Sequence, residues 1–137
     1  MKAYNILALA TVPALCCSLT SCSRDAEDYI EDTADIFNEA AELLEEATPS
    51  NADEIADDIN DLVDDLKELQ KEAKEDEEEL KKEIEGMTSE EKAELMKPAL
   101  EAGMKLGFAI EKAQKSGAMD NSKLQKAVMS LMSVKPM

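Results

Sequence analysis

Residues 51–86, NADEIADDINDLVDDLKELQKEAKEDEEELKKEIEG, decide the fold of this chain. Apolar side chains recur here at alternating steps of four and three residues, with one miss at Asp76, and charged residues fill most positions between them. This spacing is typical of a helix with one apolar seam. The seam consists of Ile55, Ile59, Leu62, Leu66, Leu69, Ala73 and Leu80. We therefore expect one helix over residues 52–85, ended by Gly86, with its seam buried against other helices.

Three further helices are expected, one before this helix and two after it. Residues 24–47 carry apolar side chains on one helical face, and TPSN at 48–51 ends that helix and caps the next. TSEE at 88–91 is a capping-box pattern that opens a helix over residues 89–116. A short helix over residues 122–133 follows. The chain is therefore expected to be all-α.

The short connections predict how these helices are arranged. Helices joined by a few residues usually lie antiparallel. The expected fold is a slender antiparallel three-helix bundle or coiled coil, with the short fourth C-terminal helix packed at one end. In this register the lysines of the third helix lie opposite acids of the second, for example Lys105 near Glu68 and Lys112 near Asp61. Exposed pairs of this kind select the arrangement more than they stabilise it.

A row of small residues marks the third expected helix. Ala99, Gly103 and Gly107 recur every four residues. We interpret the row as internal packing, because small faces allow helices of one bundle to approach closely. A contact surface for a partner helix is the alternative.

The first 23 residues carry a different pattern. Lys2 precedes an apolar run over residues 6–19 that contains no charge and is too short to span a membrane. Leu19-Thr20-Ser21-Cys22 follows, with a branched apolar residue, two small residues and a cysteine. This segment resembles the lipobox of bacterial lipoprotein precursors. The alternatives are an uncleaved anchor helix and a signal that is cut at residues 21–23 without acylation.

The resemblance implies a division of the chain and a location. Residues 1–21 are then a cleaved signal peptide, and residues 22–137 are the mature acidic helical domain. The thiol of Cys22 takes a diacylglycerol and its new amino group is acylated, which gives stable anchoring to the membrane of a bacterial cell envelope. Ser23, not Asp, follows the cysteine, a choice that favours the outer membrane under the enterobacterial sorting rule.

The mature chain is strongly acidic. All 32 acids lie in it with 14 of the 15 bases, Lys2 being the other, so its formal charge is −18. Nucleic acid is excluded as a partner, because affinity for it depends on neutralising phosphates. Cys22 is the sole cysteine of residues 22–137, so no intramolecular disulfide forms there.

The composition also excludes most site chemistry. The chain has no histidine and residues 22–137 hold one cysteine, so zinc sites, di-iron sites and Ser–His or Cys–His nucleophiles cannot be assembled there. No glycine-rich phosphate loop or EF-hand occurs. We expect no enzymatic activity and no cofactor.

An acidic cluster crowds two turns of the second helix. It consists of Asp57, Asp58, Asp61, Asp64 and Asp65. Our main interpretation is a solvated face, since charge runs usually keep a protein soluble. The alternative is a diffuse site for divalent cations or a cationic peptide.

The C-terminal helix is the predicted partner contact. Its candidate residues are Leu124, Val128, Met129, Leu131 and Met132. Clustered methionines bind Cu(I) in some proteins, but a methionine-rich face more often packs adaptably against a core or a partner.

The sequence thus predicts a membrane-anchored, non-catalytic envelope lipoprotein that acts as a structural or interaction module. Its partner is the membrane through Cys22, together with another envelope protein or a second copy. The alternative function is an acidic binder of divalent cations or cationic peptides in the envelope.

Overall fold

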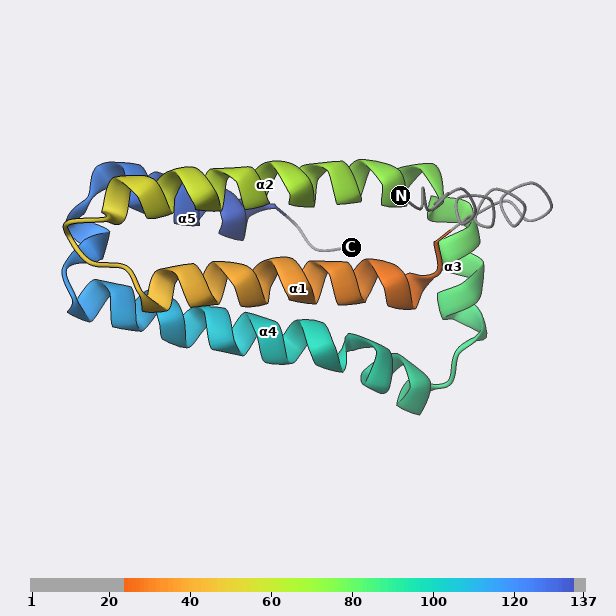
Figure 1. The fold of residues 1–137 in the computed structure, drawn as a ribbon. Helices are drawn as coiled ribbons and strands as arrows, with labels where there is room; N and C mark the ends of the chain where they lie inside the picture. Colours follow the sequence, from red (N-terminus) through yellow and green to blue (C-terminus); the bar gives the residue numbers. More distant parts are fainter. Residues whose placement is uncertain (1–23, 135–137) are drawn as a thin grey trace, which may run out of the picture.

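Helices make up nearly all of residues 24–134, the part of the chain that the computed structural model describes (Figure 1). In chain order the elements are α1 (Ala26–Glu45), α2 (Ala52–Glu75), α3 (Glu77–Gly86), α4 (Ser89–Lys115), the 3₁₀ helix η1 (Ala118–Asp120) and α5 (Ser122–Ser133). No strand occurs in these residues. The predicted all-α class is confirmed. The predicted signal peptide, residues 1–21, and Cys22 lie outside the described residues.

The first two helices form an antiparallel hairpin, as the sequence predicts. Asp25 caps α1, its side chain accepting a hydrogen bond from the backbone N–H of Asp28 at 3.0 Å. The turn between the helices is closed by Asn51, whose side-chain oxygen accepts from the Thr48 backbone N–H at 2.7 Å. Every residue of the predicted seam in α2 is buried.

The single helix predicted over residues 52–85 is wrong: the chain breaks at Asp76 into α2 and α3. Asp76 occupies a seam position, where a continuous helix would bury its carboxylate at a high cost. The chain instead turns there, and the Asp76 side chain accepts a hydrogen bond from the Tyr29 hydroxyl at 2.9 Å. Helix α3 then crosses the end of α1 (Figure 1). Its Glu83 accepts from the backbone N–H of Ala26 at 3.1 Å, in the first turn of α1.

The break changes the neighbour of the next long helix. Because α3 carries the chain across the end of the hairpin, α4 runs beside α1 and parallel to it (Figure 1). Lys105 pairs with Glu42 at 3.6 Å and Lys112 with Glu45 at 3.5 Å. The predicted pairing of these lysines with acids of α2 is therefore wrong, although the lysines do face acids.

Helix α5 packs along the first half of α2. Lys123 Nζ lies 2.7 Å from an Asp57 carboxylate oxygen, and the Asn121 side chain donates to Asp53 at 3.0 Å. The loop that follows α4 also contacts the loop that follows α1, because the Ser116 hydroxyl donates to the Ala47 carbonyl at 3.0 Å. The α1–α2 hairpin is thus flanked by two helices, α4 packed on α1 and α5 packed on α2.

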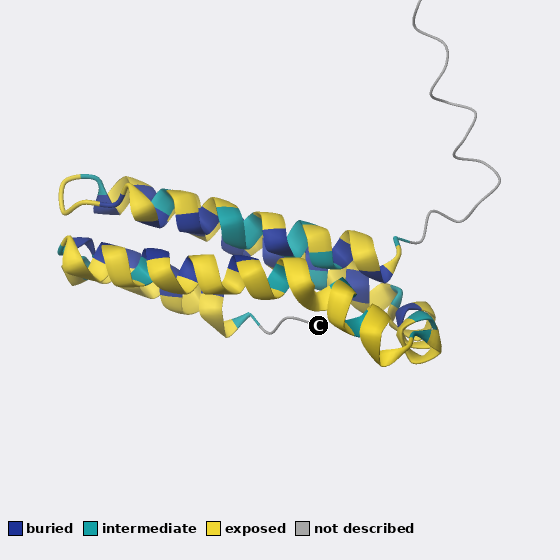
Figure 2. Cartoon of the chain, turned by 90° about the horizontal axis from the view of Figure 1, so that it is seen from below, coloured by how far each residue is buried: buried dark blue, intermediate teal, exposed yellow. Residues whose placement is uncertain are grey.

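The core runs between the α1–α2 hairpin and the two helices that flank it, and it is apolar apart from the hydroxyl of Tyr29. It is built from alanine, leucine, isoleucine and valine with Tyr29, and no polar or charged residue other than this tyrosine is buried in residues 24–134. Buried positions line the inner sides of the helices and exposed positions line the outer sides (Figure 2). None of the described helices is long and apolar enough to cross a membrane.

Candidate functional site

The described chain begins two residues after Cys22, at a cluster that holds the start of α1. Arg24 forms ion pairs with Asp32 and, at 3.1 Å, with Glu72 of α2. Its guanidinium carbon lies 5.3 Å from the centre of the Tyr29 ring, within the range of a cation–π contact. Burial, and the hydrogen bond to the Asp76 carboxylate, raise the pKa of Tyr29 to about 12. These contacts tie Arg24 to α1 and α2, two residues along the chain from the predicted acylation site.

The acidic cluster lies on the outer face of α2, and all five of its aspartates are exposed. Two of them have partners: Asp57 pairs with Lys123, and Asp64 pairs with Lys67 at 2.9 Å. The hydrogen bond to Asp57 raises the pKa of Lys123. No group of three or more carboxylates among residues 24–134 is placed to hold a metal ion.

The predicted partner contact on the C-terminal helix needs correction. Leu124, Val128 and Leu131 are buried in the core, because α5 turns this face toward α2. Met129 and Met132 lie on the other side, with exposed fractions of 66 % and 62 %. Only these two of the five candidates are accessible to a partner.

Four of the seven large apolar side chains that are exposed among residues 24–134 lie on α4, where sequence reasoning did not place them. Met96, Leu100, Met104 and Phe108 recur every four residues, and the last three are 63–67 % exposed. We call these four residues the α4 stripe. They lie opposite the buried face of the same helix, which is formed by Ala102, Leu106, Ala109 and Ala113. Helix α4 is therefore apolar on two sides, a pattern that is expected of a helix packed between two neighbours.

Two of the three small residues in the predicted row belong to this outer surface, whereas Ala99 is half-buried and lines a hollow against α1 and α2. Gly103 and Gly107 are exposed, and a β-carbon added at either position would meet nothing within 4 Å. The interpretation of these glycines as internal packing is therefore wrong. The alternative, a surface along which another helix could approach closely, fits their position on the flank of the α4 stripe.

A small apolar hollow opens between α1, α2 and α4, and three wider and more open hollows of about 300–530 Å³ lie elsewhere on the surface. The volume of the small hollow is about 40 Å³, close to that of one water molecule, and its lining is almost entirely apolar. Tyr29 and Met96 contribute to its wall. It is too small for an organic substrate.

Comparison of the chain with models of protein families, with curated proteins and with solved structures finds no match.

Proposed function

We propose that this protein is a non-catalytic lipoprotein of the bacterial cell envelope, anchored through acylated Cys22, whose helical bundle serves as a structural or protein-interaction module. The observation that carries the interaction role is the α4 stripe. A monomeric soluble protein seldom leaves a row of large apolar side chains exposed on one helix, and such rows mark contact surfaces.

The anchoring role is supported by the lipobox-like Leu19-Thr20-Ser21-Cys22 and by the short distance from it to α1. Asp25 already caps the first helix, so a chain anchored at Cys22 has almost no linker. The bundle would stay at the membrane surface, on the outer membrane by the sorting rule that Ser23 satisfies, and its partner would have to reach it there.

Metabolic labelling with a palmitate analogue tests the anchor. We expect the label on the full-length chain expressed in a bacterium, and its loss together with loss of membrane fractionation in Cys22→Ser. The matched control, Cys16→Ser with Cys17→Ser, should keep both label and location, since neither cysteine follows small residues. A label that survives Cys22→Ser would refute the proposal.

Crosslinking in intact cells tests the interaction role. The chain is purified through a C-terminal tag after crosslinking, and mass spectrometry identifies what is attached. We expect one protein, or a second copy of this chain, in a near-equal amount. Recovery of the acylated monomer alone would contradict an interaction module without affecting the result on acylation.

A further inference from the structure

The outer face of α4 differs from the other long helices in charge. Within their bounds, α1 has eight acids and no base, and α2 has ten acids and three lysines, whereas α4 has five of each. A second copy that approached α1 or α2 would bring acid against acid. Within α4 the charges balance, so the helix with the most exposed large apolar side chains is also the one where two copies repel least.

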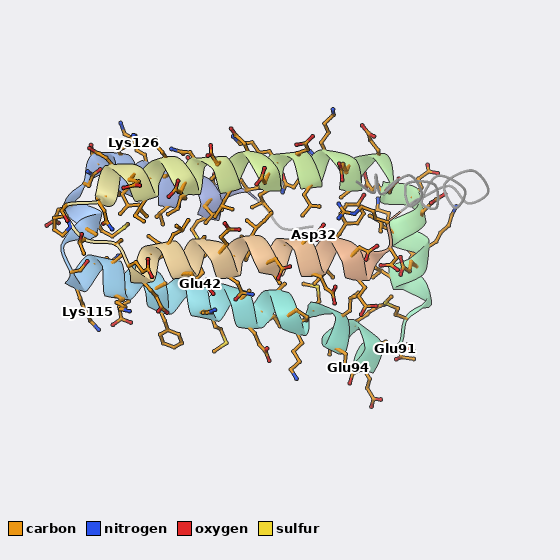
Figure 3. The ribbon with its side chains drawn as sticks, viewed as in Figure 1. Asp32, Glu42, Glu91, Glu94, Lys115 and Lys126 are labelled. Atoms are coloured by element: carbon orange, nitrogen blue, oxygen red, sulfur yellow. The ribbon has the colours of Figure 1, made fainter. Side chains whose placement is uncertain are left out.

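The charges of α4 are also ordered along the helix. Glu90, Glu91 and Glu94 outnumber Lys92 in its first two turns, and Lys112 and Lys115 outnumber Glu111 in its last two. Figure 3 shows Glu91 and Glu94 at one end of α4 and Lys115 at the opposite end. Two copies of this helix side by side would repel at both ends if parallel, and attract at both ends if antiparallel.

We propose that the α4 stripe pairs antiparallel with the α4 stripe of a second copy, around a two-fold axis near Met104. This deepens the interaction role and rests on the proposed function. Leu100 of one copy then lies opposite Phe108 of the other, and the reverse contact follows from the symmetry. Glu101 lies within one helical turn of Lys105 of the second copy, on the charged flank of the stripe. Since antiparallel symmetry brings like flanks together, the flanks that carry Gly103 and Gly107 also meet.

The same register brings two further pairs of opposite charge together, and Glu90, Glu91, Lys92 and Lys115 lie outside these pairs. Glu94 lies beside Lys112 of the second copy. Lys97 lies opposite Glu111 of the second copy. Each contact occurs twice, and all join opposite signs, which fixes the direction of pairing more than its strength.

The size of the surface predicts weak pairing in solution. From Met96 to Phe108 the stripe is about 18 Å long at 1.5 Å per residue, so one pair of helices buries an area at the low end of stable interfaces. A lipid anchor confines the chains to a surface and raises their effective concentration, so pairing is expected on the membrane. Met129 and Met132 on α5 are less suited to pairing with a second copy. Helix α5 carries Lys123 and Lys126 and no acid, so two copies of it would repel.

Disulfide crosslinking of the full-length chain in cell membranes tests the pairing. We expect Met104→Cys to give a crosslinked dimer under mild oxidation. Met129→Cys is the matched control, since the two methionines are 65 % and 66 % exposed, and it should give at most about a tenth of the dimer. Met96→Cys alone should not crosslink, because antiparallel pairing holds its two copies about 24 Å apart along the helix. Adding Phe108→Ser to Met104→Cys should lower the yield several-fold.

Four results would overturn the pairing. Equal yields from Met104→Cys and Met129→Cys would mean random collision. A strong dimer from Met96→Cys would mean parallel pairing. An unchanged yield with Phe108→Ser would mean that the stripe does not drive it. Crosslinking of Met104→Cys to a different protein would replace the second copy but leave the interaction role standing, and the palmitate label reports the anchor independently of all four.

Discussion

The Tyr29 hydroxyl donates a hydrogen bond to the Asp76 carboxylate across 2.9 Å, and this contact joins the first turn of α1 to the break between α2 and α3. Tyr29 is 2 % exposed, so its ring is part of the core while its hydroxyl reaches the one charged residue on the α2 seam. After the break, α3 crosses the end of α1. As a result, α4 lies against the side of α1 that faces away from α2. The position of the α4 stripe therefore follows from the break at Asp76, which this hydrogen bond joins to α1.

Replacing Tyr29 with Phe tests the contribution of the hydrogen bond. Tyr29→Phe keeps the buried ring and removes only the donor, so we expect the free energy of unfolding to fall by about 1.5–3 kcal/mol, the usual range for a bond to a charged group. Denaturant unfolding followed by circular dichroism measures the change. Asp76→Asn, which keeps an acceptor oxygen, should cost less than Asp76→Ala. Equal stability of Tyr29→Phe and the parent would mean that the break does not need this bond.

Burial and the Asp76 carboxylate also make the stability depend on alkaline pH. They raise the pKa of Tyr29 to about 12, against about 10 in the unfolded chain. Because the folded state holds the proton more tightly, this contribution is fully present below about pH 10 and is lost as the pH rises to about 12. The loss amounts to about 2–3 kcal/mol at about 1.4 kcal/mol per pH unit.

Tyrosinate absorbance measures this pKa directly. The chain has two tyrosines, and Tyr4 lies in the predicted signal peptide, so Tyr29 alone reports in residues 22–137. We expect its absorbance to titrate near pH 12 in the folded protein and near pH 10 in denaturant. Titration near pH 10 in both would show that the hydroxyl is not held as the structure indicates.

The sequence predicts the helices well because a regular seam is a local pattern. Every seam residue of α2 is buried, and the capping box at Thr88 is present, with the Thr88 N–H donating to Glu91 at 2.7 Å. The packing arrangement of the helices is harder to predict from the sequence, because it depends on one irregular position in the seam. Asp76 interrupts the apolar seam in the sequence. A helix break at this position is what allows α4 to run beside α1 instead of beside α2.

The surface could not be assigned from spacing alone. Helix α4 has two apolar faces, and the sequence does not show which one the bundle buries. The predicted face included Gly103, whereas the structure buries Ala102 and Ala109 on a neighbouring line of the same helix. Alanines pack closely against α1, which leaves the longer Leu100 and Met104 outside. Tertiary contacts therefore determine which of the two apolar faces is buried, and the other face is exposed as the α4 stripe.

Calcium binding by the acidic cluster is a separate question that melting curves answer. Because Asp57 and Asp64 already pair with lysines, we expect millimolar Ca²⁺ to raise the melting temperature no more than NaCl of matched ionic strength. Both salts should raise it, since they screen the repulsion among the excess acids of a chain of formal charge −17. A larger rise with Ca²⁺, abolished by Asp61→Asn with Asp65→Asn, would instead favour a cation binder.

Substituting alanine for the outer glycines of α4 tests whether they serve the fold or the surface. A β-carbon at Gly103 or Gly107 meets no atom, so the monomer should gain about 0.4–1 kcal/mol from each replacement through helix propensity and lower entropy of the unfolded chain. The melting temperature is measured in a Met104→Lys background, which removes pairing through the α4 stripe. Gly117→Ala is the control, because Gly117 has φ of 80° and alanine is strained there, so this change should destabilise.

If Gly103→Ala and Gly107→Ala stabilise the monomer yet lower the crosslinking yield of Met104→Cys, the glycines are retained for close approach of a second helix. Destabilisation by either would mean that they face the core.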